Sequence, residues 1–254
     1  MFDLTGTVAL ITGATKGIGR AIAFAMAEAG AKVVVSSRDA ERCAETAGAI
    51  NDAGGDASGY ACNISHTDQL RSLVDHALAA HGRIDCLVCN AAVNPHYGPM
   101  ATITEEAYDK IMASNVKSSL WLCNMVAPQM AERRDGSIII ISSIAGMAGS
   151  KGIGVYGISK AADSQLARNL AVEWGADNIR ANCIAPGLVK TDFARALWED
   201  PEMSAQALKG YPLGRLGEPE DIAGAAVFLA AKAGQWLTGQ TIVIDGGWAI
   251  GRGA

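Results

Sequence analysis

Thr12-Gly13-Ala14-Thr15-Lys16-Gly17-Ile18-Gly19 joins a short apolar run, 7–12, to a stretch of helical spacing, 18–29. In such a strand–turn–helix unit the first glycine makes the turn and the second lets backbone amides approach a pyrophosphate. The third allows the helix to pack closely on the strand. The three glycines stand at offsets 0, 4 and 6 instead of the 0, 2 and 5 of the common dinucleotide-binding fingerprint, and this spacing is itself diagnostic. The segment therefore predicts a dinucleotide site, and its context disfavours the alternative of a plain turn.

Short apolar runs alternate with longer amphipathic segments along the whole chain. The runs lie at 7–12, 32–36, 57–62, 84–89, 137–142, 179–184 and 241–244. The helical segments lie at 18–29, 40–52, 68–80, 105–130, 155–174 and 221–231. Alternating strands and helices form parallel sheets with right-handed crossovers. We therefore predict one doubly wound Rossmann-type α/β domain over residues 1–254, with a parallel sheet of about seven strands covered by helices on both faces.

Two segments depart from the pattern. Pro128 falls near the end of 105–130, where we expect it to break the helix. Residues 192–217 are the least patterned and contain the aromatic residues Phe193, Trp198 and Tyr211. A long irregular stretch beyond a strand end is a candidate substrate loop. The alternative is a surface excursion packed on its own aromatic side chains.

Composition narrows the function classes. A net charge of −5 without a basic run disfavours a nucleic-acid partner. The apolar runs are too short to span a bilayer, and Met1 to Leu4 show no signal-peptide pattern, so we predict a cytoplasmic protein without a membrane partner. Cys86 and Cys89 read C-x-x-C but would point to opposite faces of a buried strand. No metal site is expected.

A tyrosine and a lysine four residues apart, Tyr156 and Lys160, fall in a helical segment, with Ser143 thirteen residues before the tyrosine. Positions i and i+4 share a helix face, so the ammonium can lie beside the phenol. A nearby cation favours the phenolate and lowers the phenol pKa, which makes a proton shuttle for neutral pH. Taken alone, each of these residues also has a purely structural interpretation, such as a helix cap for Ser143.

The residues after the second strand distinguish two dinucleotides. A carboxylate there binds the free ribose hydroxyl of NAD, whereas a cation accommodates the phosphate of NADP. The chain reads Ser36-Ser37-Arg38, and Lys16 adds a second cation. We therefore favour NADP(H), with NAD(H) left open. The alternative is that both cations are solvated surface charges.

With these residues in hand, the chain resembles the compact short-chain dehydrogenase/reductases from Val8 to Gly247. The motifs that carry the resemblance are the glycine turn, Asn90-Ala91-Ala92, Asn115, Ser143, Tyr156 with Lys160, Pro186-Gly187 with Thr191, and Asp245-Gly246-Gly247. Residues 90–95, 36–38 and 185–191 resemble the branch of NADPH-dependent carbonyl and retinal reductases.

The resemblance implies a role for each matching position. The catalytic set would be Asn115, Ser143, Tyr156 and Lys160: Tyr156 the proton donor, Lys160 its neighbour on the ribose, Ser143 the substrate-oxygen ligand and Asn115 the organiser of a water relay. Cofactor contacts would come from the glycine turn (Gly13, Thr15, Lys16, Gly17, Ile18, Gly19), the following strand ends (Ser37, Arg38, Asn63, Ile64, Asn90, Ala91, Ala92), Tyr156, Lys160 and the loop Pro186, Gly187, Val189 and Thr191. Substrate contacts would come from Ser143, Asn94, His96, Gly187 and Trp198.

Two positions depart from the family pattern. Asn63 stands where aspartate is usual, and Ala92 where glycine is usual; the Ala92 methyl would crowd the cofactor slightly. The resemblance implies an NADP(H)-dependent oxidoreductase that reduces aldehydes or ketones and is reversible as a secondary-alcohol dehydrogenase. It also implies a homotetramer. The alternatives are an NAD-dependent catabolic alcohol dehydrogenase and a non-enzymatic dinucleotide sensor.

Overall fold

The computed structural model describes residues 1–251, except the side chains of Ala196, Met203 and Gln206; the end of the expected domain, 252–254, lies outside the described residues. Seven strands form one parallel sheet in the order β3-β2-β1-β4-β5-β6-β7. They are β1 (Val8–Thr12), β2 (Lys32–Ser37), β3 (Asp56–Ala61), β4 (Cys86–Cys89), β5 (Gly136–Ile141), β6 (Ile179–Pro186) and β7 (Thr241–Ile244). The predicted fold class is confirmed.

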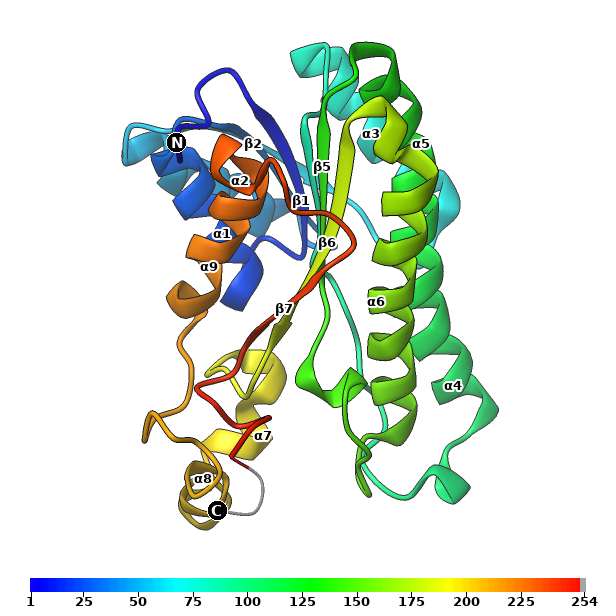
Figure 1. Cartoon of the computed structure of the whole chain (residues 1–254), viewed down its shortest axis with the longest axis vertical. Coiled ribbons are helices and arrows are strands. Elements are labelled where there is room, and N and C mark those ends of the chain that lie inside the picture. The colour runs from blue at the N-terminus through cyan, green and yellow to red at the C-terminus, as the bar shows by residue number, and fades with distance from the viewer. Residues whose placement is uncertain (252–254) are drawn as a thin grey trace.

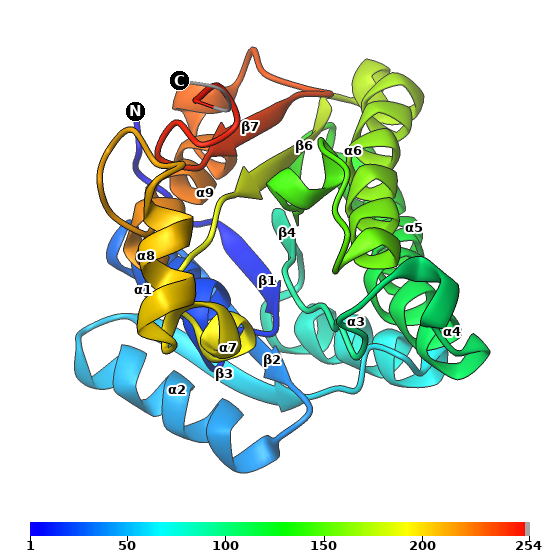
Figure 2. The same ribbon diagram turned by 90° about the horizontal axis from the view of Figure 1, so that it is seen from below.

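Helices cover both faces of the sheet (Figures 1 and 2). One face carries α1 (Gly17–Glu28), α2 (Ala40–Asp52) and α9 (Pro219–Ala230), and the other carries α3 (Thr67–His81), α5 (Ser118–Arg133) and α6 (Gly154–Trp174). Each face has its own apolar core. Because side chains alternate along a strand, β4 places Cys86 in the first core and Cys89 in the second. The opposed orientation predicted for these two thiols is confirmed.

The strand order reverses between β1 and β4, which are neighbours in space but not in sequence. In open α/β sheets a ligand binds in the crevice at the carboxyl ends of the strands, at such a switch point. The turn after β1 and the loops after β4, β5 and β6 therefore meet at one edge. That edge contains the motifs singled out in the sequence.

The segment 105–130 is not one uninterrupted α-helix. It consists of α4 (Glu105–Met112), a π-helical turn (Ala113–Lys117) and α5, and Pro128 lies inside α5. The expected break at Pro128 is wrong, because a proline removes only one backbone donor. Val126, Ala127 and Met130 around it are fully buried in the core, and this packing offsets the loss.

The segment 192–217 is more regular than its sequence suggests. It contains a 3₁₀ turn (Asp192–Ala194) and two short helices, α7 (Arg195–Trp198) and α8 (Pro201–Leu208). Tyr211 is buried beyond them, and its hydroxyl accepts a 2.8 Å hydrogen bond from the Leu188 amide. The segment is thereby fixed to the loop after β6. Among the described residues, no helix is long and apolar enough to cross a membrane, and no group of His, Cys, Asp or Glu is arranged to hold a metal.

Candidate active site

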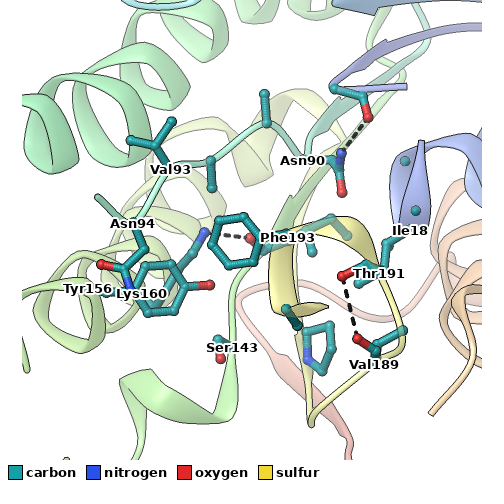
Figure 3. Close-up of a pocket in the computed structure, with 18 of the residues that line it drawn as sticks. Ile18, Asn90, Val93, Asn94, Ser143, Tyr156, Lys160, Val189, Thr191 and Phe193 are labelled. Atoms are coloured by element: carbon teal, nitrogen blue, oxygen red, sulfur yellow. Dashed lines mark hydrogen bonds between the residues drawn. The ribbon is translucent and has the colours of Figure 1, made fainter. Parts of the chain in front are cut away.

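A cleft of about 960 Å³ lies at the switch point. Most of the residues predicted to bind cofactor or substrate line it: Gly13, Thr15, Lys16, Gly17, Ile18, Gly19, Ser37, Arg38, Asn63, Ile64, Asn90, Ala91, Ala92, Asn94, Ser143, Tyr156, Lys160, Pro186, Gly187, Val189 and Thr191. Figure 3 shows Tyr156, Lys160 and Asn94 at one end of this cleft, with Ile18 and Thr191 toward the other. Its size suits a large organic ligand.

The glycine turn is packed so closely that a side chain cannot be added at its third glycine. A Cβ on Gly19 would lie 2.3 Å from the Gly13 carbonyl oxygen. Asn90 closes the turn from β4, because its Nδ2 donates to the carbonyls of Thr12 at 2.9 Å and Gly13 at 3.1 Å. The glycine therefore allows β1, α1 and the end of β4 to approach one another.

The first turn of α1 borders the cleft, and no side chain caps its backbone amides. Its N-cap residue, Lys16, makes no side-chain cap, and no acidic residue lies in the first turn. The first amides of a helix lack intrahelical partners and carry partial positive charge, so such an end attracts phosphate. These features fit the pyrophosphate of a dinucleotide.

Cations gather at the end of the cleft beyond β2. Arg38 and Arg42 line it there, and Arg42 Nε lies 3.3 Å from a carboxylate oxygen of Asp39. Lys16 Nζ lies 3.8 Å from Asp192 across the groove. The sequence analysis missed Arg42, although its place in the first turn of α2, four residues after Arg38, was a usable signal.

Tyr156 and Ser143 come from neighbouring elements at the opposite end. Ser143 follows β5, and its hydroxyl accepts a 3.1 Å hydrogen bond from the Ala145 amide, as a cap would. Tyr156 lies in the first turn of α6, with its ring centroid 5.9 Å from that of Phe193. Lys160 Nζ is 5.7 Å from the Tyr156 ring centroid. The structure thus brings together the phenol, ammonium and hydroxyl that the sequence singled out.

The Lys160 ammonium is held by two buried acceptors. It donates at 2.9 Å to the Ile141 carbonyl oxygen and at 2.9 Å to Asp163 Oδ2. Lys160 is 3% exposed and Asp163 is 1% exposed. Burial alone lowers the pKa of the ammonium, but Asp163 and Tyr156 more than offset it, so the pKa lies above its usual value. Asp163 was also missed, although a charge three residues after Lys160 in a buried helix is a readable signal.

The Tyr156 phenol experiences opposing influences. Burial raises its pKa, Lys160 lowers it, Asp163 raises it and the Ser143 hydroxyl lowers it. The net direction is upward, because burial exceeds the effect of the cation. The expected action of Lys160 is therefore present, but the pKa of the phenol does not fall below its ordinary value.

Asn115 lies in the π-helical turn and is absent from the described lining of the cleft. Its Oδ1 accepts from the Val93 amide at 2.8 Å, and its Nδ2 donates to the Val93 carbonyl at 3.0 Å and to Ser159 Oγ at 3.0 Å. The side chain thereby fixes the loop after β4 to α6. A water relay at Asn115 stays a prediction.

Two predicted substrate residues do not line the cleft in the part of the chain that the structure describes. His96 bonds the nearby Pro99 carbonyl through Nε2 at 3.2 Å. Trp198 donates its indole N–H to the Thr191 carbonyl at 2.9 Å. The indole supports the wall from outside, because its polar atom finds a backbone partner there.

Comparison with known proteins gives consistent relatives. A family model described as Enoyl-(Acyl carrier protein) reductase matches residues 13–249. "Dehydrogenase/reductase SDR family member 4" of Oryctolagus cuniculus is 42% identical over 244 residues, covering 96% of this chain and 94% of the relative.

Solved structures agree with this chain over nearly its whole length. A gluconate 5-dehydrogenase from Burkholderia cenocepacia, in complex with NADP and tartrate, has a TM-score of 0.94 and 34% identity, covering 98% of this chain and 97% of the other. A 7 alpha-hydroxysteroid dehydrogenase, complexed with NADH and 7-oxo glycochenodeoxycholic acid, has a TM-score of 0.93 and 38% identity, covering 97% and 95%. The first of these two structures is complexed with NADP and the second with NADH.

Proposed function

This chain belongs to the short-chain dehydrogenase/reductase family of NAD(P)-dependent enzymes acting on CH–OH groups, and from that premise we propose that it reduces aldehydes or ketones with NADPH. The same site would oxidise secondary alcohols in reverse. The observation that carries the proposal is the Tyr156 phenol beside the Lys160 ammonium, in the cleft that the glycine turn borders.

Each residue of this centre has a separate task. When bound, the nicotinamide supplies or accepts the hydride. Negative charge grows on the substrate oxygen during reduction, where the hydroxyls of Ser143 and Tyr156 would stabilise it by preoriented hydrogen bonds. Tyr156 would then give its proton to that oxygen, and Lys160 would hold the ribose. Asn115 would keep Val93 and the loop after β4 in place.

The preference for NADPH is supported by the cations near β2. Arg38 lines the cleft with Ser37, and Arg42 lies one turn further along the chain. A guanidinium pairs with a phosphate through two hydrogen bonds, whereas a solvated ribose hydroxyl offers it much less. Asp39 is partly neutralised by Arg42, so its charge opposes a phosphate only weakly.

The wall beside Tyr156 supports an apolar carbonyl substrate. Phe193 packs against Tyr156, and Ile144, Ile153 and Leu197 are further apolar side chains in the lining of the cleft. Such side chains stabilise a hydrocarbon body, while the hydroxyls of Ser143 and Tyr156 orient one oxygen. The relative with the steroid ligand binds a molecule of this general kind, a ketone named 7-oxo glycochenodeoxycholic acid.

A carbonyl panel with both cofactors tests the proposal. We expect apolar ketones or aldehydes to be reduced with NADPH more efficiently than with NADH. The variant Tyr156→Phe should keep NADPH binding and lose turnover by several orders of magnitude, since the proton donor is gone. Retained turnover in that variant would contradict the assignment.

The same panel separates the rivals. Equal or better efficiency with NADH favours an NAD-dependent catabolic alcohol dehydrogenase. An enoyl thioester belongs in the panel because of the description of the matching family model. Reduction of that thioester but of no carbonyl would overturn the proposed substrate class.

We also propose a homotetramer. Apolar side chains are exposed on α5 and α6, among them Trp121, Ile158 and Val172. Long helices with such faces bury them against symmetry mates in closed assemblies. Light scattering coupled to size exclusion tests this directly, and a monomer at micromolar concentration would contradict it.

A further inference from the structure

Asp163 is the one buried carboxylate in contact with the proposed proton-transfer centre among the described residues. Its Oδ2 accepts from Lys160 Nζ at 2.9 Å, and its Oδ1 is buried without a hydrogen-bond partner. A buried charge with an unsatisfied oxygen is costly to keep. Nothing in the roles proposed above, in which Lys160 serves Tyr156 and the ribose, requires it.

Two side chains from the sheet fix the helix backbone that carries this carboxylate. The Cys183 thiol on β6 donates to the Asp163 carbonyl at 3.2 Å, and the Ser142 hydroxyl donates to the Lys160 carbonyl at 2.7 Å. The turn of α6 that contains Lys160 and Asp163 is therefore bonded to β6 and to the residue that follows β5. The Lys160 ammonium has the Ile141 carbonyl and Asp163 as acceptors and the Tyr156 ring nearby.

Few titratable side chains among the described residues surround the Lys160–Asp163 pair. The titratable groups that face the pair are Tyr156 on α6, Cys183 on β6 and Cys123 on α5, and Tyr97 faces Tyr156 from the loop after β4. Burial, with Asp163 adding to it, raises the pKa of Cys183 to about 12, so that thiol is neutral in ordinary buffers. Burial raises the pKa of the Asp163 carboxyl above its usual value, and the Lys160 ammonium opposes that rise. The phenol therefore lies beside an ion pair, Lys160 with Asp163.

We propose that Asp163 is a positioning residue of the catalytic centre, which holds the Lys160 ammonium and offsets its charge so that Tyr156 keeps its proton at neutral pH. The carboxylate thereby suits the centre to reduction, which needs the protonated phenol. The equilibrium of the overall reaction is unchanged, but the pH range in which each direction runs is displaced. The inference rests on the proposed role of Tyr156 as proton donor.

The variant Asp163→Asn tests the charge while keeping the shape. In alcohol oxidation with NADP⁺ the rate rises with pH as the phenol ionises, and we expect that limb to move toward acid by about one pH unit. The matched control is Ser164→Ala, the next residue on α6, whose hydroxyl accepts from Thr241 at 3.2 Å. Its limb should stay where the wild type has it. A purely structural role for Asp163 would lower the amount of active enzyme without moving the limb, and that result would overturn the proposal.

A second measurement needs neither turnover nor a folded Asp163 variant. The ultraviolet difference titration of wild type minus Tyr156→Phe reports the ionisation of this one phenol in the intact protein. We expect phenolate to form only well above pH 7. Ionisation below pH 7 would overturn the inference about Asp163 and leave the proposed function standing, whereas failure of every carbonyl in the panel would overturn the proposed function and, with it, the premise of the inference.

Discussion

The two ends of the cleft hold their cations in opposite ways. At the Tyr156 end, the Lys160 side chain is 4% exposed and fixed by a buried carboxylate, whereas at the β2 end the side chains of Lys16 and Arg42 are 57% and 59% exposed. A buried charge must have a permanent partner, while an exposed charge is solvated until a ligand arrives. The contrast predicts that changes at the first end affect folding and chemistry together. Changes at the second end should affect cofactor choice alone.

The largest effect is expected from Lys160→Met, which leaves Asp163 charged and unpaired. Breaking a buried pair in this way costs about 3–5 kcal/mol. We therefore expect a fall in Tm of roughly 10 °C and a loss of turnover of about a thousandfold or more. Thermal unfolding and steady-state kinetics measure the two effects.

The double variant Lys160→Met with Asp163→Leu separates the loss of stability from the loss of turnover. Replacing both charges by apolar side chains of similar volume is often neutral for stability. We expect Tm to return toward the wild type while turnover stays lost. If turnover returned as well, the ammonium would not be part of the chemistry.

Asn115→Ala comes next, because this side chain joins the loop after β4 to α6. Its loss leaves the Val93 amide and carbonyl without a side-chain partner, at a cost of about 2–4 kcal/mol in the free energy of unfolding, whereas the Ser159 hydroxyl still donates to the Tyr156 carbonyl. Denaturant unfolding measures this. Ser119→Ala is the control, since it removes a single buried hydrogen bond nearby, from the Ser119 hydroxyl to the Asn115 carbonyl, and it should lose less; an equal loss would mean that the Val93 bonds do not stabilise the loop.

A smaller and more selective effect is expected from Arg38→Ala. Loss of a charge-assisted contact to a phosphate should raise KM for NADPH by about 10- to 100-fold and leave KM for NADH unchanged. The matched control is Lys32→Ala, which removes an exposed cation paired with Asp56 at the other end of the same strand. An equal rise for both cofactors would contradict the role of Arg38 in selectivity.

The smallest effect is expected from Asp221→Asn, at the exposed start of α9. Hydrogen bonds from Arg215 lower the pKa of Asp221 from 3.8 to about 2. A carboxylate with a lowered pKa stabilises the folded state above its unfolded pKa, and this contribution is lost as pH falls toward about 2. The Tm difference between wild type and variant should therefore be small, constant above about pH 5 and mostly lost by pH 2. A difference that is unchanged at pH 2 would point to packing instead.

Local pattern was sufficient for the sheet, the glycine turn and the Tyr156–Lys160 pair, because their signals lie within a few residues. It was insufficient where a distant partner decides the outcome. Pro128 stays helical because the core packs around it, and Trp198 turns to the Thr191 carbonyl, which no spacing rule indicates. Asp163 lies three residues after Lys160 and Arg42 three residues after Asp39, so pairing of opposite charges along a helix would have found them.

The π-helical turn 113–117 has a consequence for insertions and deletions. The Ser118 amide bonds to the Ala113 carbonyl, five residues back, so the chain carries one residue more than an α-helix would need there. Deleting one residue inside this turn would close it to an α-helical turn and leave the direction of the buried stripe of α5 nearly unchanged. Deleting one residue from the regular part of α4 or α5 would instead rotate the rest of the helix by about 100° and turn that stripe away from the sheet. The turn is therefore the place along 105–133 where a change in length is expected to disturb packing least, although it contains the buried Asn115.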